Sequence, residues 1–134
     1  MSSELSQGIT QIEHIALATN HLESLCDFYG QLGGVALPFS PDPSNGLRVF
    51  DFCGVRLEVF ERPRSRHAAT GNGRSSRLLH LGFTLGSADA VDELSRVLAA
   101  AGHQVLEPPH RANELGRYES VVLDPDGNRL KFSV

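Results

Sequence analysis

The sequence predicts an α+β domain built from two copies of a βαβββ unit. The stretches that begin "IEHIALATNHLESLCDFYG" and "LLHLGFTLGSADAVDEL" each read as a strand, a helix and three further strands. Between them lies "ERPRSRHAATGNGRSSR", which is rich in Arg, Ser and Gly and has no apolar periodicity. We therefore expect one domain over residues 1–134, with module one at about 10–61, a linker at about 62–77 and module two at about 78–134.

Both predicted helices carry start and stop signals. Asn20 followed by Glu23 is a capping-box pattern, and Gly33 follows the first apolar stripe. In the second unit, Ser87 is the expected N-cap and Gly102 ends the helix. The stripes have the spacing of a helix that packs one face on a sheet. They consist of Leu22, Leu25, Phe28, Tyr29 and Leu32 in the first unit, and of Val91, Leu94, Val97, Leu98 and Ala101 in the second.

Two turns join the predicted strands into hairpins. Cys53 and Gly54 separate "LRVFDF" from "VRLEVF", and "DPDG" separates "YESVVL" from "NRLKF". In "RLEVF" and "NRLKF" hydrophobic and polar residues alternate, which is typical of strands with one buried face. We expect the segment "EPPHRANELGRYES" to be a loop that covers a cavity.

Composition argues against several classes of function. The net charge of −4 argues against nucleic acid or an anionic membrane as a partner. No apolar run approaches the roughly 20 residues that a membrane span needs. The polar start "MSSELSQG" lacks the pattern of a secretion signal, so we expect a cytoplasmic protein. Cys26 and Cys53 are then expected to be free thiols.

Four titratable side chains are predicted on the sheet faces opposite the helices. Because strand side chains alternate, His14 and Glu58 fall on that face in module one, and His80 and Lys131 fall on it in module two. Each module thus offers one such residue from its first strand and one from its last. Lys131 is the only lysine among the 12 Lys and Arg residues of the chain.

These motifs resemble the vicinal oxygen chelate superfamily, which includes glyoxalase I, bleomycin-resistance proteins and extradiol dioxygenases. The resemblance is carried by the paired βαβββ modules, by "EHIAL" and "LLHLGF", and above all by the terminal "DPDGNRLKF". It covers about residues 12–132. It implies the glyoxalase/bleomycin-resistance/dioxygenase fold, in which the two modules form a curved sheet around a cavity.

The resemblance also implies a metal centre. In metal-binding members the ligands come from the first and last strands of each module, which here correspond to His14, Glu58, His80 and Lys131. Two imidazoles and a carboxylate suit a divalent ion such as Fe, Mn, Ni, Co or Zn. The bound metal would act as a Lewis acid on a small oxygen-rich substrate.

Lys131 departs from the family pattern, which usually has Glu at this position. A lysine ammonium has no lone pair to donate to a metal. Lys131 could therefore take a catalytic role, pair with Glu58 in place of a metal, or be a solvated residue near the C-terminus. The histidines could equally be hydrogen-bonded structural residues, and Glu58 could pair with Arg56.

Two functions remain open at this stage. The first is a metal-dependent lyase, isomerase or oxygenase, which the pattern of His14, Glu58 and His80 favours. The second is a metal-free protein that binds and sequesters a small molecule, as bleomycin-resistance proteins do, and Lys131 favours it. In both cases we expect a homodimer. The expected substrate contacts are Arg56, Phe60, Arg117 and Tyr118, whereas the histidines expected to be exposed in caps, linker or loops are His21, His67, His103 and His110.

Overall fold

The structure of the protein is a computed structural model that describes residues 8–38, 46–61, 79–112 and 116–134. The chain divides into two compact units, Met1–Arg64 and Ser65–Val134, which correspond to the two predicted modules and are described separately. The predicted linker at about 62–77, with His67, lies outside the described residues. None of the described helices is both long enough and apolar enough to cross a membrane.

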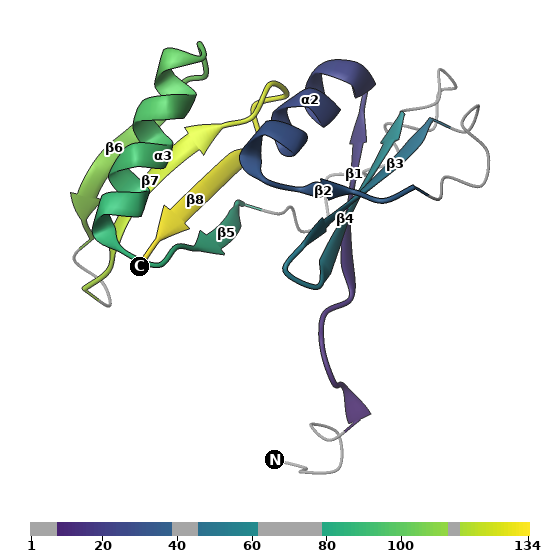
Figure 1. Cartoon of the computed structure of the whole chain (residues 1–134), viewed down its shortest axis with the longest axis horizontal. Coiled ribbons are helices and arrows are strands. Elements are labelled where there is room, and N and C mark those ends of the chain that lie inside the picture. The colour runs from purple at the N-terminus through teal and green to yellow at the C-terminus, as the bar shows by residue number, and fades with distance from the viewer. Residues whose placement is uncertain (1–7, 39–45, 62–78, 113–115) are drawn as a thin grey trace. The chain divides into compact units, whose positions relative to one another are not determined.

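Module one has the predicted order of strand, helix and three strands (Figure 1). Its sheet has the strand order β1-β4-β3-β2, in which β1 and β4 are parallel and the other pairs are antiparallel. The helix packs on β3 and β4. The elements are β1 (His14–Thr19), α2 (Leu22–Leu32), β2 (Val35–Ala36), β3 (Leu47–Phe52) and β4 (Val55–Glu61).

Module two repeats this topology. Its sheet has the order β5-β8-β7-β6, with β5 and β8 parallel, so each strand corresponds to one in module one. The helix packs on β6, β7 and β8 (Figure 1). The elements are β5 (Leu81–Thr84), α3 (Ala88–Ala100), β6 (Val105–Arg111), β7 (Tyr118–Leu123) and β8 (Arg129–Ser133). The predicted α+β fold of two βαβββ modules is confirmed.

The start of α2 differs from the prediction. The N-cap is His21 rather than Asn20, and no side chain caps the helix. The Thr19 hydroxyl instead accepts a hydrogen bond from the His21 backbone N–H at 2.9 Å. The predicted stop is confirmed, because Gly33 ends the helix with φ of 116°, a left-handed conformation that favours glycine. The predicted stripe is buried at Leu22, Leu25, Phe28 and Tyr29.

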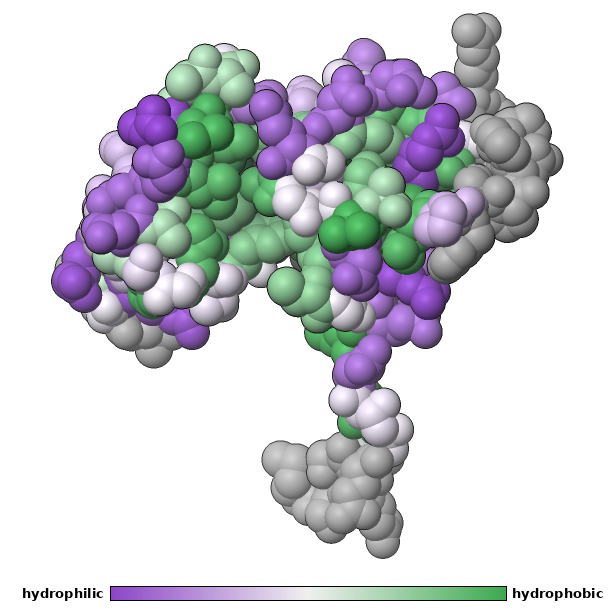
Figure 2. All heavy atoms as spheres, in the orientation of Figure 1, coloured by the Kyte–Doolittle hydropathy of each residue, from purple (hydrophilic) through white to green (hydrophobic). Residues whose placement is uncertain are grey.

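The start of α3 agrees with the prediction. Ser87 is the N-cap, and its hydroxyl accepts a hydrogen bond from the Ala90 backbone N–H at 3.1 Å. The buried face of α3 differs from the predicted stripe. Val97, which belongs to the stripe, is 40% exposed, and Ser95, which does not, is buried. In the view of Figure 2, hydrophilic and hydrophobic residues form separate bands over the part of module two that contains α3. The helix is therefore amphipathic, with Val91 and Leu98 at its buried centre.

Both hairpin turns form as predicted. Cys53 and Gly54 have φ of 52° and 95°, as a two-residue turn with two positive φ angles requires. In the second turn the buried Asp124 carboxylate organises the backbone, since one oxygen accepts hydrogen bonds from the N–H groups of Asp126 and Asn128 at 2.9 Å. Its other oxygen accepts a bond from the Asn128 side chain at 2.7 Å. This turn connects β7 to β8 and fixes their register.

The two cysteines, both free thiols, should differ sharply in reactivity. Burial raises the pKa of Cys26 in α2 to about 11, because the thiolate is poorly solvated there. Cys53 is exposed at the β3–β4 turn. At pH 8 only about one Cys26 side chain in a thousand is a thiolate, which is the reactive form. We expect iodoacetamide to label Cys53 quickly and Cys26 slowly, as measured by peptide mass spectrometry.

A control in denaturant should label both thiols at similar rates, and Cys53→Ser should abolish the fast phase. Equal labelling rates in the native protein would contradict the placement of Cys26.

Candidate functional site

His14 and Glu58 share the face of the module-one sheet opposite α2. His14 begins β1, and its register partner on β4 is Arg56, while Glu58 pairs with Ala16. Glu58 therefore lies diagonally across from His14, on the neighbouring strand and two positions beyond the direct partner of His14. His14 is exposed and Glu58 is half-buried. The Nδ1 atom of His14 lies 3.0 Å from the carboxylate of Glu13, which orients the ring and leaves Nε2 as the other nitrogen.

His80 and Lys131 occupy the corresponding diagonal in module two. Lys131 pairs with Gly82, and His80 lies two positions before Gly82, immediately ahead of β5. The relation of His80 to Lys131 is thus the relation of His14 to Glu58. The equivalence expected from the sequence repeat is present in the register of both sheets.

His80 and Lys131 line one pocket of module two. Its volume is about 350 Å³, which is within the range of small-molecule sites. Charged and hydroxyl groups dominate the wall, because Arg117 and Glu119 lie alongside His80 and Lys131. The remaining lining residues are Gly82, Phe83, Thr84, Ala112 and Ser133.

Lys131 forms an ion pair within its own module. Its Nζ atom lies 3.4 Å from Oε2 of Glu119 on the adjacent strand β7. The side chain of Lys131 is 31% exposed and that of Glu119 only 10%, so the pair is largely shielded from water. Lys131 is therefore partly shielded from water and has an anionic partner. A carboxylate buried to this degree depends on its partner, because an unpaired buried charge is costly.

Sequence reasoning did not single out Glu119, although two local signals point to it. The "DPDG" turn sets the β7–β8 pairing, in which Val121 lies opposite Lys131 and Glu119 lies opposite Ser133. Alternation then places Glu119 on the same face as Lys131, one diagonal step away. The corresponding residue in module one is the apolar Leu47, which pairs with Phe60, so module one has no ion pair at this diagonal.

The expected substrate contacts occupy different places. Arg117 lines the module-two pocket and is exposed. Arg56 and Phe60 lie on the module-one face that carries Glu58, and both are exposed. Tyr118 does not line the module-two pocket, because its hydroxyl donates a hydrogen bond to Asp92 on α3. That bond stabilises the neutral phenol and raises the pKa of Tyr118.

The prediction for residues 107–120 is partly wrong. The stretch through Arg111 belongs to strand β6 rather than to a loop, and His110 is half-buried on that strand rather than exposed. His103, also predicted to be exposed, is half-buried ahead of the same strand. The strand was not apparent because Pro108 and Pro109 interrupt it, and proline is uncommon inside sheets. Residues 113–115 of the same segment lie outside the described part of the chain.

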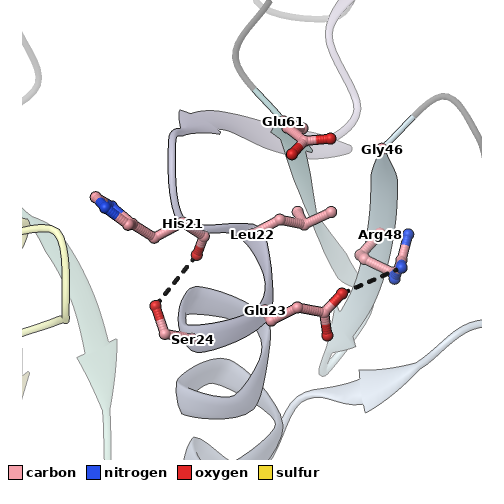
Figure 3. Close-up of a pocket in the computed structure, with 7 residues that line it drawn as sticks. All are labelled: His21, Leu22, Glu23, Ser24, Gly46, Arg48 and Glu61. Atoms are coloured by element: carbon pink, nitrogen blue, oxygen red, sulfur yellow. Dashed lines mark hydrogen bonds and ion pairs between the residues drawn. The ribbon is translucent and has the colours of Figure 1, made fainter.

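Module one has a larger pocket beside the start of α2 (Figure 3). It encloses about 580 Å³ and contains none of the four residues predicted as ligands or catalytic groups. Glu23 and Arg48 form an ion pair at its wall, with 3.6 Å between the charged groups. Glu61 adds a second carboxylate. Because both carboxylates are exposed and Arg48 is only half-buried, this ion pair is less shielded from water than the Lys131–Glu119 pair.

The chain matches the Glyoxalase/Bleomycin resistance protein/Dioxygenase superfamily over residues 11–132. It belongs to this superfamily. The matched region includes both modules, and the resemblance expected from the sequence motifs is confirmed. No curated protein matches the chain. The superfamily contains proteins with several activities, so membership establishes the fold and leaves the reaction open.

Solved structures with the same fold include three bacterial proteins. A glyoxalase/bleomycin resistance protein/dioxygenase family enzyme from Burkholderia phytofirmans PsJN is 21% identical, with a TM-score of 0.74 over 92% of this chain and 98% of that one. Lactoylglutathione lyase from Agrobacterium tumefaciens is 23% identical, with a TM-score of 0.70 over 93% of each chain. A glyoxalase/dioxygenase from Nostoc punctiforme is 21% identical, with a TM-score of 0.72 over 92% and 89%. At these identities the likeness concerns the fold alone.

The Lys131–Glu119 pair should contribute measurably to stability. Lys131→Met leaves the buried Glu119 carboxylate without its ammonium partner. We expect the free energy of unfolding to fall by about 1–2 kcal/mol, less than for a fully buried pair because Lys131 retains some contact with water. Urea denaturation followed by circular dichroism measures the change.

Arg129→Met is the matched control, because it removes an exposed cation from the same strand and should change stability by less than about 0.5 kcal/mol. A double-mutant cycle with Glu119→Gln should give a coupling energy near 1 kcal/mol. If Lys131→Met cost no more than Arg129→Met, the pair would contribute nothing to the fold.

Proposed function

We propose that this protein is a divalent-metal-dependent enzyme, of the lyase, isomerase or oxygenase type, that acts on a small oxygen-rich substrate. His14, Glu58 and His80 would hold the metal, and Lys131 would act on the substrate. The observation that carries the proposal is the Lys131–Glu119 ion pair. In this pair the Glu119 carboxylate compensates the ammonium charge of Lys131. Lys131 occupies the one ligand position at which this chain departs from the family's pattern.

The three proposed ligands suit a metal in their chemistry. The contact between His14 Nδ1 and Glu13 resembles the carboxylate–histidine arrangement that orients metal-binding imidazoles, with Nε2 available as the ligand atom. His80 lines the module-two pocket, and Glu58 offers a half-buried carboxylate. Two histidines and one carboxylate form a common site for Fe, Mn, Co, Ni or Zn with open coordination positions. When bound, such an ion supplies Lewis-acid chemistry.

The charged residues of the module-two pocket suggest how the protein would act on its substrate. The Lys131 ammonium can donate hydrogen bonds to a substrate oxygen on which negative charge develops. Glu119 holds that ammonium in place and can exchange a proton with it or with a substrate group. Arg117, which is exposed at the wall of the pocket, can bind a carboxylate or another anionic part of the substrate.

A metal-free binding protein is the second candidate, and the same ion pair supports it. Lys131 and Arg117 give the pocket two cations that recognise an anionic ligand without any metal. In this case Glu119 and the hydroxyls of Thr84 and Ser133 would add specificity. The two candidates differ in one measurable respect, which is whether ligand binding requires a divalent ion.

We also propose that the protein is a homodimer. In both sheets an outer strand, β2 in module one and β6 in module two, pairs with only one neighbour among the described strands. Such edges are commonly covered by association with another chain. We expect multi-angle light scattering at micromolar concentration to give twice the mass of the chain. A monomer mass would contradict this prediction.

The metal proposal predicts an order of affinities at position 131. Lys131→Glu removes a positive charge and adds a ligand, so it should tighten metal binding at least tenfold relative to the wild type. Lys131→Met removes only the repulsion and should give a smaller gain. His80→Ala removes a ligand and should weaken binding by about 10- to 100-fold. Isothermal titration calorimetry with Ni²⁺, Co²⁺, Mn²⁺ and Zn²⁺ measures these changes.

His21→Ala is the matched control, because it removes an exposed histidine that is outside the proposed ligand set. When His80→Ala is also present, the tenfold gain from Lys131→Glu should be lost and only the several-fold gain from removing the Lys131 charge should remain, which assigns the difference to this site. Equal affinities for wild type and His80→Ala would exclude His80 as a ligand and favour the metal-free binding protein.

A further inference from the structure

A second group of metal-ligating side chains lies on the outer strand β6 of module two and on its neighbour β7. Glu107 and His110 on β6 and Glu119 on β7 each present a ligand atom, and these three atoms lie within 4.8 Å of one another. None of the three belongs to the ligand set expected from the sequence. The group combines an imidazole with two carboxylates, which is a donor set suited to Zn²⁺ and related ions.

An irregularity in β6 brings Glu107 and His110 to the same face. In a regular strand, residues three positions apart point to opposite faces of the sheet. Here Glu107 pairs with Val121 and His110 pairs with Glu119, so three steps on β6 match two steps on β7. One extra residue is inserted at Pro108–Pro109, which is a β-bulge. Bulges of this kind re-aim side chains, and the prolines explain its position because neither can donate a ladder hydrogen bond.

The tautomer of His110 is also set for metal binding. Its Nδ1 atom lies 2.8 Å from the backbone carbonyl oxygen of Pro108, which can only accept a hydrogen bond. The proton of the neutral ring is therefore on Nδ1, and the lone pair is on Nε2. Nε2 faces the carboxylate of Glu107 at 3.6 Å. Metal-binding histidines are commonly oriented by this kind of bond from the opposite ring nitrogen.

Glu119 supplies a rigid anchor for the group. Its side chain is only 10% exposed, whereas the side chains of Glu107 and His110 are 51% and 42% exposed. Lys131 lies 3.4 Å from one carboxylate oxygen of Glu119, and a carboxylate has two oxygens that can each accept, so Glu119 can face Lys131 and a cation together. The exposed Glu107 can close the remaining distance, because ligand atoms at 2.0–2.1 Å from a tetrahedral ion are about 3.4 Å apart.

We propose that Glu107, His110 and Glu119 form a divalent transition-metal site in module two. The ion completes its coordination with water, since the described residues offer three ligands. The site is distinct from the set of His14, Glu58 and His80, and it does not depend on the proposed function. Lys131 connects it to the substrate pocket, because an ion on Glu119 competes electrostatically with the Lys131 ammonium. Zinc binding at this site therefore weakens the Lys131–Glu119 pair.

Calorimetry with Zn²⁺ on the His80→Ala protein tests this site with the affinity of the first one lowered about 10- to 100-fold. We expect about one equivalent of Zn²⁺ to remain bound. Adding His110→Ala should weaken this binding at least tenfold. Glu107→Gln should weaken it several-fold and serves as a second variant, because this isosteric change of a half-exposed side chain leaves the bulge intact. Lys131→Met should instead tighten it several-fold by removing a competing charge.

His103→Ala is the matched control, because it removes another half-buried histidine of module two that is outside the group. It should leave the Zn²⁺ affinity of the His80→Ala protein unchanged. Mg²⁺ should not compete, since it prefers oxygen ligands to imidazole. The proposal is overturned if the His80→Ala protein binds no Zn²⁺, or if neither His110→Ala nor Glu107→Gln weakens binding. Either outcome leaves the test of the first metal site unaffected.

Discussion

The hydrogen bonds accepted by the buried carboxylate of Asp124 hold the turn on which module two depends. They tie the N–H groups of Asp126 and Asn128 to one oxygen and thereby fix the register of β7 against β8. Strand side chains alternate with a period of two, so a slip of one residue would move Lys131 to the face that α3 covers. The pocket, the ion pair and the carboxylate of the second metal group all require the register that this turn sets.

The two modules share one strand topology but differ in the charges on their last strand and its antiparallel neighbour. Module one has Glu58 on its last strand and Leu47 on the neighbouring strand, whereas module two has Lys131 and Glu119 at the corresponding positions. A lysine alone would bring an uncompensated charge to a half-buried face, which is energetically costly. The carboxylate on the adjacent strand offsets that cost. The Lys131–Glu119 pair thus requires both residues of module two, and module one has an apolar residue, Leu47, at the position of Glu119.

The bulge in β6 shows how a local irregularity creates chemistry that a regular sheet would not have. The inserted residue at Pro108–Pro109 turns His110 to the side of Glu107 and Glu119. The same backbone supplies the carbonyl group that fixes the tautomer of His110. Glu119 then belongs to two systems, since it pairs with Lys131 and also faces His110. Events at the edge of the sheet are therefore coupled to the charge state of the pocket.

The sequence by itself determined the repeat, the βαβββ order of each module, the Ser87 cap and the face on which His14, Glu58, His80 and Lys131 lie. These features follow from periodicities of 2 and 3.6 residues and from local turn chemistry, which are encoded within short segments. Only the tertiary structure decided that Lys131 pairs with Glu119 and that His110 joins Glu107. The first depends on the register between neighbouring strands, and the second on a bulge seen only against its partner strand. Both are set by hydrogen bonds between strands. The "DPDG" turn and strand alternation could have pointed to the first, whereas no pattern within β6 alone could reveal the second.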